Sequence, residues 1–300
     1  MVHTFEAFKY EEMTVSNGTL NNEHLFETFI AFFTEIVNGG VGKVLTFKLT
    51  DDHKTKVDMF KDVWKESNPE EKNMIVLDLC EILGDLAPNG FYFGEHEGNA
   101  SDIGYWRTEE SRTYIGTVET DELEDYLRRR ITTNAVNLPQ ECVIFDVDGT
   151  LAHMTEERHP EPRKRPFQWD KVGTDKVDPN IKWLANLVYS SRFHGMNYKP
   201  ETERSECSYA SPFVIIVTGR DGVCHEETRK WLKDNGIQYD ALYQRPKYNN
   251  LKDSIIKKDI YEQFIKPNFK VKAVFDDRNQ VVDMWRELGL TCCQVAEGDF

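Results

Sequence analysis

The segment from Cys142 to Leu151 constrains the fold of this chain more than any other stretch. It opens with an apolar, β-branched and aromatic run and ends in Asp146 and Asp148, followed by glycine and threonine. A short run of this kind is typical of a fully buried strand in a parallel sheet. Open α/β sheets bind ligands beyond the carboxyl ends of such strands. The sequence therefore predicts that Asp146 lies at the ligand-binding edge of an α/β sheet.

Asp146 and Asp148 are two residues apart, and they lie on the same side of the chain if it stays extended. Carboxylates so close together repel each other unless a cation lies between them, which favours a metal site. An aspartate followed by glycine is also a common turn pair, which favours an ordinary turn after a strand. The motif by itself leaves both interpretations open.

A second acidic pair favours the metal site over the ordinary turn. The apolar strand expected at 270–275 ends at Asp276 and Asp277. Carboxyl ends of parallel strands meet at one edge of a sheet, so the two acidic pairs come together there. Such a set of oxygen ligands is what a hard divalent cation such as Mg²⁺ requires. Without a cation, the gathered carboxylates would destabilise the fold, so a metal site is the favoured hypothesis.

The C-terminal half alternates between strands and helices. Asp178 and Pro179 are typical of the cap and first residue of a helix, and Gly236 and Gly289 are typical helix terminators. This β-α-β order predicts an α/β domain with a Rossmann-like parallel sheet and helices on both faces. Strands are expected at 142–146, 213–217, 239–243, 270–275 and 290–295, with helices from 178, up to 235, over 250–265 and over 279–288.

The chain of 300 residues is long enough for two domains, and the short stretch 137–140 is a plausible linker. We therefore expect an N-terminal domain over 1–137, a separate, smaller and mainly helical α+β module, and an α/β domain over 138–300. Apolar periodicity predicts N-terminal helices at 22–37, 54–64, 70–86 and 121–131, and alternation predicts a strand at 43–49.

Net charge separates the two halves. The chain carries −15, of which residues 1–140 account for −13 and residues 141–300 for −2. An acidic module of this kind would repel nucleic acid or attract a basic protein partner. Residues 90–106 place Glu95, His96, Glu97 and Asp102 in one polar stretch, which favours a hairpin loop between aromatic strands over a metal site.

Other classes of protein are disfavoured by the sequence. No apolar run approaches the length of a membrane span, the first residues do not resemble a signal peptide, and the six cysteines include no C-x-x-C pair. We expect an intracellular, cytoplasmic protein without a membrane partner. Glycines 39, 40 and 42 with Lys43 suggest a phosphate loop, but Val37 and Val44 occupy the positions that need glycine and a hydroxyl.

The stretch Phe145-Asp146-Val147-Asp148-Gly149-Thr150 resembles motif I of the haloacid dehalogenase (HAD) superfamily of phosphohydrolases. The segments 275–286 and 294–300 are similar to the phosphatase domains of bacteriophage polynucleotide kinase/phosphatases. The resemblance covers 141–300 and does not extend to 1–137. It implies a HAD fold and a Mg²⁺-dependent phosphatase of nucleic-acid 3′-phosphate ends, active in DNA or RNA repair. Kinase activity is not carried over, because the phosphate loop is lacking.

The resemblance also implies a role for each matching residue. Asp146 would be the nucleophile that forms an aspartyl-phosphate, and Asp148 the general acid and base. Thr218, which alone is typical of an ordinary strand-to-helix turn, and Lys257, with Lys252 as second choice, would neutralise the phosphate. The implied Mg²⁺ ligands are Asp146, the main-chain carbonyl of Asp148, Asp276 and, in support, Asp277; the implied substrate-binding residues are Arg220, Arg245, Arg165 and Asp253.

Two other functions stay open at this point. The C-terminal domain could be a 5′- or 3′-nucleotidase or another small-molecule phosphatase, with a nucleotide as substrate. Alternatively, the chain could be a non-catalytic interaction protein whose acidic N-terminal module binds a partner. The acidic side chain at Asp148, which has no evident structural need, argues against the non-catalytic alternative. The resemblance to bacteriophage enzymes would place the protein in the cytoplasm of a host cell.

Overall fold

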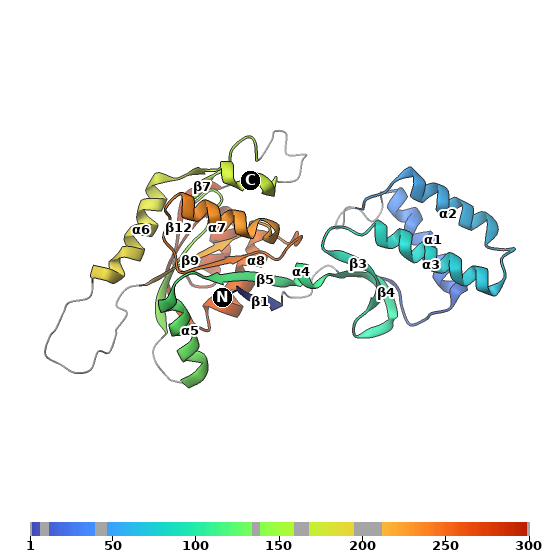
Figure 1. Ribbon diagram of the computed structural model, residues 1–300, viewed down its shortest axis with the longest axis horizontal. Helices are drawn as coiled ribbons and strands as arrows, with labels where there is room; N and C mark the ends of the chain where they lie inside the picture. Colours follow the sequence, from blue (N-terminus) through green and yellow to red (C-terminus); the bar gives the residue numbers. More distant parts are fainter. Residues whose placement is uncertain are drawn as a thin grey trace. The chain divides into compact units, whose positions relative to one another are not determined.

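The structure is a computed structural model that describes residues 2–6, 12–39, 47–133, 139–158, 168–194 and 212–298. The chain forms two compact units (Figure 1). One unit is Phe8–Arg112, and the other combines Met1–Ala7 with Thr113–Phe300. No helix in the described part of the chain is long and apolar enough to cross a membrane.

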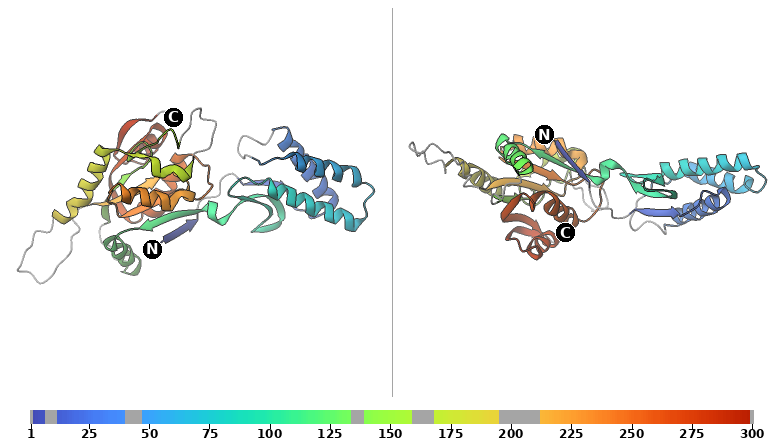
Figure 2. Two further views of the ribbon diagram at one scale, coloured as in Figure 1. Left: turned by 45° about the horizontal axis from the view of Figure 1, so that its top comes forward. Right: turned by 90° about the horizontal axis from the view of Figure 1, so that it is seen from below.

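The larger unit is built on a seven-stranded sheet, shown in two further views in Figure 2. Its parallel part has the order β10-β9-β6-β11-β12, so the chain starts in the middle and crosses over to both sides. Two antiparallel strands, β5 and β1, extend the sheet beyond β10. The strands are β1 (Val2–Glu6), β5 (Thr113–Val118), β6 (Gln140–Phe145), β9 (Phe213–Thr218), β10 (Ala241–Gln244), β11 (Phe269–Arg278) and β12 (Cys292–Gly298).

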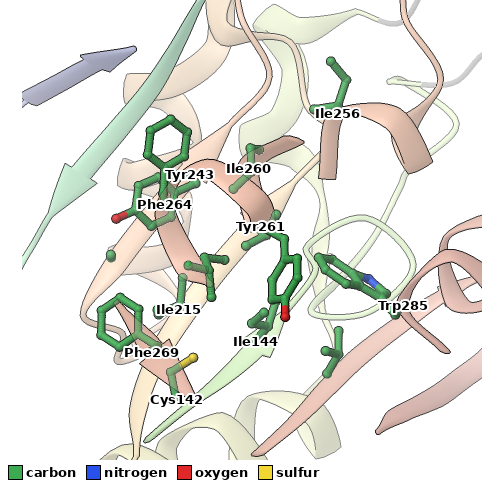
Figure 3. Close-up of a cluster of buried hydrophobic side chains, with 14 of the residues drawn as sticks. Cys142, Ile144, Ile215, Tyr243, Ile256, Ile260, Tyr261, Phe264, Phe269 and Trp285 are labelled. Carbon is green, nitrogen blue, oxygen red and sulfur yellow. The ribbon is translucent and has the colours of Figure 1, made fainter. Parts of the chain in front are cut away.

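Alternate residues of the central strand β6 face two different apolar cores, because successive side chains in a strand point to opposite faces. Cys142 and Ile144 belong to a core that also contains Ile256, Phe264 and Trp285 (Figure 3). These partners come from α8 (Asp253–Ile260), the π-helical turn η3 (Tyr261–Ile265) and α9 (Asn279–Glu287). Helical segments therefore cover this face of the sheet.

The other face of the sheet has its own core. Val143 and Phe145 of β6 pack there with Ala185 and Trp231. These partners belong to α6 (Pro179–His194) and α7 (His225–Asp234). Asp178 accepts hydrogen bonds from the main-chain N–H groups at the start of α6, as expected for a helix cap. The predicted α/β fold, with a mainly parallel sheet covered by helices on both faces, is confirmed.

The structure divides the chain differently from the predicted boundary at 137/138. Strand β5 pairs with β10, and helix α5 (Asp121–Thr133) belongs to the same unit. The Tyr114 hydroxyl donates to Asp259, and the Tyr126 hydroxyl donates to the main-chain oxygen of Asn268. Residues 113–133 are thus bound into the α/β unit, and the boundary moves to between Arg112 and Thr113.

The smaller unit is an insertion between two paired strands. Glu6, the last residue of β1, is the register partner of Thr113, the first residue of β5. In its described residues, the unit combines four helices with an antiparallel sheet of order β2-β4-β3. Its elements are β2 (Met13–Ser16), α1 (Asn22–Val37), α2 (Asp51–Val63), α3 (Pro69–Asp85), β3 (Phe91–His96), β4 (Asn99–Arg107) and the short α4 (Glu109–Arg112).

Of the elements predicted for this unit, the hairpin is confirmed and part of a strand is wrong. The hairpin expected at 90–106 is present, as β3 and β4 pair in antiparallel fashion. The strand predicted at 43–49 is wrong for residues 47–49, which have no regular structure, and its remainder lies outside the described residues, as does the glycine-rich stretch around Lys43. The cysteines in the described part of the chain are all unpaired: Cys80, Cys142, Cys224, Cys292 and Cys293.

Candidate active site

Adjacent parallel strands bring the two acidic pairs together. Asp146 directly follows β6, and its main-chain N–H donates to the Phe275 carbonyl of β11 at 3.0 Å. The rings of Phe145 and Phe275 stack with their centroids 4.8 Å apart, which fixes the register just before both acidic ends. Asp276 follows Phe275 within β11. The strand ends therefore converge on one edge of the sheet, as the sequence predicts.

Three carboxylates form a tight cluster at this edge. Asp146, Asp276 and Asp277 are all buried, and each offers an oxygen within 4.8 Å of the others. No other group of three such side chains is found in the described part of the chain, so Glu95, His96, Glu97 and Asp102 do not gather into one. Buried oxygen donors at this spacing fit a hard divalent cation such as Mg²⁺.

Lys257 lies between two of these carboxylates. Its Nζ is 2.8 Å from Asp146 Oδ1 and 2.8 Å from Asp276 Oδ2. The indole N–H of Trp285 also donates to Asp276, at 3.2 Å. The ammonium side chain is only 3% exposed, so the ion pairs act in an environment that screens them weakly. Of the two lysines considered from the sequence, the structure places Lys257 at the cluster and Lys252 on the wall of the cavity described below.

The cluster shifts the pKa values of its members. Burial raises the pKa of Asp146 well above its ordinary value, and the carboxylates of Asp276 and Asp277 raise it further, against the pull of Lys257. Burial and the neighbouring Asp276 raise the pKa of Asp277 to about 6. Burial by itself would lower the pKa of Lys257, but attraction to Asp146 and Asp276 outweighs it and raises that pKa. A cation would relieve the repulsion among the carboxylates.

Asp148 lies in a second, separate ion cluster. Arg158 donates to both of its carboxylate oxygens, at 2.8 and 2.6 Å, which is a bidentate pair. Arg220 donates to Asp148 Oδ1 from two nitrogens, at 2.7 and 3.0 Å. Asp175 joins both arginines from the other side, through an ion pair with Arg158 and a 2.6 Å hydrogen bond from Arg220. Both guanidinium groups are therefore held in place against Asp148.

The arginines determine the charge of Asp148. Burial alone would raise its pKa, but the positive charges and hydrogen bonds of Arg220 and Arg158 lower it well below the ordinary range. The Asp148 carboxylate is therefore ionised and oriented in this arrangement. Arg220 is 1% exposed and also packs over the Trp231 ring, so it acts as a buried anchor of Asp148 here.

A third network surrounds Asp253. Arg245 forms an ion pair with Asp253 and donates to the main-chain oxygens of Gly219 and Asn249 at 2.6 and 2.7 Å. Arg278 donates to the other Asp253 oxygen at 2.5 Å. The predicted substrate-binding side chains of Arg245 and Asp253 thus tie together the loops after β9, β10 and β11. They line the cavity while holding its wall.

Thr218 and Arg165 are the remaining predicted residues. Thr218 is the last residue of β9 and is buried, and its hydroxyl accepts a hydrogen bond from the Arg220 main-chain N–H at 3.3 Å. Its neighbour Gly219 lines the cavity, whereas Thr218 is absent from the described lining. Arg165 lies outside the described residues.

Glycine is required at two points around the cluster. Gly149 has φ +85°, and a Cβ there would lie 2.0 Å from Asp277 Oδ2. A Cβ on Gly219 would lie 2.4 Å from Asp253 Oδ1. The chain after β6 and after β9 therefore passes directly against acidic side chains from β11 and α8, and only glycine leaves them room.

A cavity of about 420 Å³ opens over these groups. Its wall includes Asp146, which the buried strand β6 presents to it, together with Asp148 and Lys257. The other side chains on the wall that bear on function are Met154, Trp169, Asp221, Arg245, Lys252, Asp253, Asp277, Arg278 and Gln280. The cavity therefore combines a buried carboxylate, cationic side chains and two members of a carboxylate cluster that could hold a metal ion.

Sequence reasoning missed three residues of the site, namely Arg158, Asp175 and Arg278. Arg158 and Asp175 lie in the charged stretch 152–177, where nothing in the pattern distinguishes a buried arginine from a solvated one. Arg278 directly follows the second acidic pair, and that position is the one signal that could have found it. All three act through contacts that only the folded chain creates.

Comparison with known proteins places this site in a family. A family model described as the polynucleotide kinase PNKP phosphatase domain matches residues 140–300. The chain is 30% identical over 148 residues to a protein of Autographa californica nuclear polyhedrosis virus, proposed to be a bifunctional polynucleotide kinase/RNA ligase. That match covers 49% of this chain and 18% of the viral protein, so the chain spans less than a fifth of that relative's length.

Two solved structures also resemble the chain. They are of the Pnkp1/Rnl/Hen1 complex and of the Pnkp1/Rnl/Hen1 RNA repair complex, each at 30% identity with a TM-score of 0.44. The similarity covers 55% of this chain and 49% or 45% of the matched chains. With the family model spanning more than half of its residues, the chain belongs to the family of polynucleotide kinase PNKP phosphatase domains.

Proposed function

We propose that this protein is a Mg²⁺-dependent phosphatase that removes 3′-phosphates from polynucleotide ends through an aspartyl-phosphate on Asp146. The observation that carries the proposal is the position of Asp146. Asp146 directly follows the central strand β6, and its carboxylate pairs with Lys257 at 2.8 Å. The same carboxylate lies beside those of Asp276 and Asp277 and lines an open cavity. Membership in the polynucleotide kinase phosphatase family supports a polynucleotide end as substrate.

Asp146 acts as the nucleophile on phosphorus. A carboxylate can form a covalent intermediate that divides the hydrolysis into two easier steps. The P–O bond to the leaving alcohol breaks as the Asp146 oxygen bonds to phosphorus, and water then cleaves the acyl-phosphate to release inorganic phosphate. Lys257, already paired with Asp146, neutralises charge on the transferring phosphoryl group.

Asp148 acts as the general acid in the first step and as the general base in the second. Its ionised state suits the second step, in which it takes a proton from the attacking water. In the first step it has to donate a proton to the leaving alkoxide. A bound phosphate dianion would raise the pKa of Asp148 by repulsion, while Arg158 and Arg220 keep the carboxyl group in place. Substrate binding would thereby favour proton donation.

The three clustered carboxylates would hold the metal. Asp146, Asp276 and Asp277 supply hard oxygen donors in a buried site, and their mutual repulsion favours binding of a cation between them. When bound, Mg²⁺ would offset the repulsion between the anionic carboxylate and the anionic phosphate. The main-chain carbonyl of Asp148 remains a further proposed ligand.

Three related proposals follow from the sequence and the cavity. The protein lacks kinase activity, since its glycine-rich segment does not have phosphate-loop spacing. The inserted unit Phe8–Arg112 binds a basic protein partner, because acidic side chains dominate it. A mononucleotide is an alternative substrate, because a cavity of about 420 Å³ is large enough for a small organic ligand.

The test is phosphate release with Mg²⁺ from four substrates: a 3′-phosphorylated oligonucleotide, a 3′-nucleotide, a 5′-nucleotide and an aryl phosphate. We expect fast release from the oligonucleotide, lost in Asp146→Asn, which keeps the shape of the side chain. Preference for mononucleotides would make the protein a nucleotidase instead. No release from any substrate by the folded protein would overturn the proposed mechanism.

A further inference from the structure

The cavity over Asp146 exceeds what a phosphoryl group needs. Its volume of about 420 Å³ lies in the range of sites that enclose small organic ligands. The groups proposed to act on phosphorus, Asp146, Asp148 and Lys257, make up only part of the wall. The rest of the wall is therefore available to the remainder of the substrate.

Most residues of this wall are charged or polar, but Trp169, Met154 and Leu251 contribute large apolar side chains. Trp169 begins the short helical segment η1 (Trp169–Thr174), which is anchored in the interior by Val172 at 0% exposure. An indole on the wall of a charged cavity stays partly exposed, as Trp169 does, and gains less from burial than one in the core. Part of the Trp169 side chain is therefore accessible to a ligand in the cavity.

Other tryptophans of the same unit show the contrast. Trp231 and Trp285 are buried to 2% and 0% exposure, and their indole N–H groups donate to Asp175 and Asp276. Both therefore have a clear structural role. Trp183 is 65% exposed on the outer side of α6 and does not line the cavity. Trp169 alone of these four forms part of the cavity wall.

The Trp169 ring is held by a buried cation. The Arg158 guanidinium carbon lies 5.2 Å from the ring centroid, and Arg158 is itself fixed by Asp148 and Asp175. A ring fixed on a buried arginine loses little conformational freedom when it binds a second flat group. The same arginine connects the ring to Asp148, so the aromatic surface and the reacting groups are parts of one rigid assembly.

We propose that Trp169 is the base-binding residue of this site and stacks on the terminal nucleobase whose 3′-phosphate reaches Asp146. The inference rests on the proposed polynucleotide 3′-phosphatase activity. Stacking on an aromatic side chain accepts every base, because all bases present a π-face. An enzyme that heals ends of any sequence needs recognition of this kind. Met154, flexible and polarizable, adapts to purines and pyrimidines beside the ring.

The test compares two oligonucleotides that differ only at the 3′-phosphorylated terminal residue, which either carries a base or is abasic. Trp169→Ala is expected to lower kcat/KM for the substrate with a base by roughly tenfold, the size of one stacking interaction. It should change kcat/KM for the abasic substrate by less than twofold. Trp169→Phe should restore most of the loss, and the matched control Trp183→Ala should behave as the wild type.

A binding measurement gives a second readout that does not need turnover. In Asp146→Asn, the oligonucleotide with a terminal base is expected to quench tryptophan fluorescence, and the added change Trp169→Phe should remove that quench. Equal losses on both oligonucleotides in Trp169→Ala would show that the ring only supports Arg158, and would overturn the inference. So would the absence of any effect. If the wild type released phosphate from neither substrate, the proposed function itself would fall, and the inference with it.

Discussion

Lys257 Nζ lies 2.8 Å from Asp146 Oδ1, and both side chains are at most 5% exposed. The same nitrogen lies 2.8 Å from Asp276 Oδ2. A single buried ammonium thus balances part of a cluster of three carboxylates. The contact connects the stability of the fold to the chemistry of the site, because the charge that stabilises the cluster also stands where the phosphoryl group is expected.

Replacing Lys257 by methionine should affect both properties. Removing one partner of a buried ion pair leaves uncompensated charge, which destabilises a protein by about 3–5 kcal/mol. Removing a charged group that stabilises the transition state lowers kcat by about 10²–10³. Mg²⁺ should raise Tm more in Lys257→Met than in the wild type, as measured by thermal melts with and without the ion. An equal rise in both proteins would argue against a metal at the cluster.

Arg158→Ala should remove the bidentate contact that orients the Asp148 carboxylate. General acid–base catalysis contributes about 10²–10⁴ to rate, so we expect kcat on an oligonucleotide 3′-phosphate to fall by at least 10². An aryl phosphate with a good leaving group needs little proton donation and should lose much less. The ratio of kcat values on the two substrates is the measurement. A uniform loss on both would assign Arg158 to phosphate binding instead.

Gly149→Ala should damage the metal cluster without removing any carboxylate. The new Cβ would lie 2.0 Å from Asp277 Oδ2, and the backbone there has φ +85°. Backbone strain at such a position costs about 1–3 kcal/mol, so Tm should fall and Mg²⁺ affinity should weaken. Gly173→Ala is the matched control, because its added Cβ meets nothing within 4 Å. Unchanged Mg²⁺ affinity in Gly149→Ala would show that Asp277 is not a ligand.

His225 should make stability depend on pH near neutrality. Burial lowers the pKa of His225 below its ordinary value of 6.5, against a hydrogen bond to Gln244 and the charges of Glu226 and Glu119, while Arg229 lowers it further. As pH falls below 6.5, the unfolded chain binds a proton that the folded chain resists, so the free energy of unfolding falls. Denaturant unfolding between pH 7.5 and 5.5 should show a smaller drop in His225→Gln than in the wild type. Identical drops would mean that His225 does not titrate on unfolding.

The predicted and observed boundaries can be separated by deletion. Removing residues 1–137 would take away β1, β5 and α5, exposing the edge of β10 and the apolar face that Tyr114 and Leu123 cover. That variant should be insoluble or molten. Excising 8–112 and joining Ala7 to Thr113 through a short turn should keep a cooperative melt and phosphatase activity. Loss of folding in the excision variant alone would restore the predicted boundary.

The sequence allows the parallel sheet and the acidic edge to be predicted because both depend on local patterns. The apolar run before Asp146 and the one before Asp276 are short, continuous and end in carboxylates, which is sufficient to place them. Strand β5 was not recognised, because its pairing with β10 joins residues far apart in the chain. The linker expected near 137 follows a helix that packs on the sheet, so weak periodicity there did not mark a domain boundary.

Some residues of the site can likewise be predicted from local sequence patterns, and others cannot. Asp146, Asp276 and Lys257 gather as expected from strand ends and from the resemblance, and Asp148 lines the same cavity. The binding of Asp148 by two buried arginines could not be predicted. Arg158 and Asp175 come from a charged stretch whose sequence is typical of a solvent-exposed loop. Arg220 and Arg245, expected to bind substrate, make hydrogen bonds inside the protein, and the substrate-binding role stays a prediction. Such roles depend on burial, which is set by the fold as a whole.

The insertion between β1 and β5 also sets an order for biosynthesis. Val2 pairs with Thr117, more than a hundred residues later in the chain. Strand β1 therefore waits for its neighbour β5 while the whole of Phe8–Arg112 is synthesised, and that unit has its own apolar core. The inserted unit can thus fold before β1 has its partner in the sheet, although β1 precedes that unit in the chain.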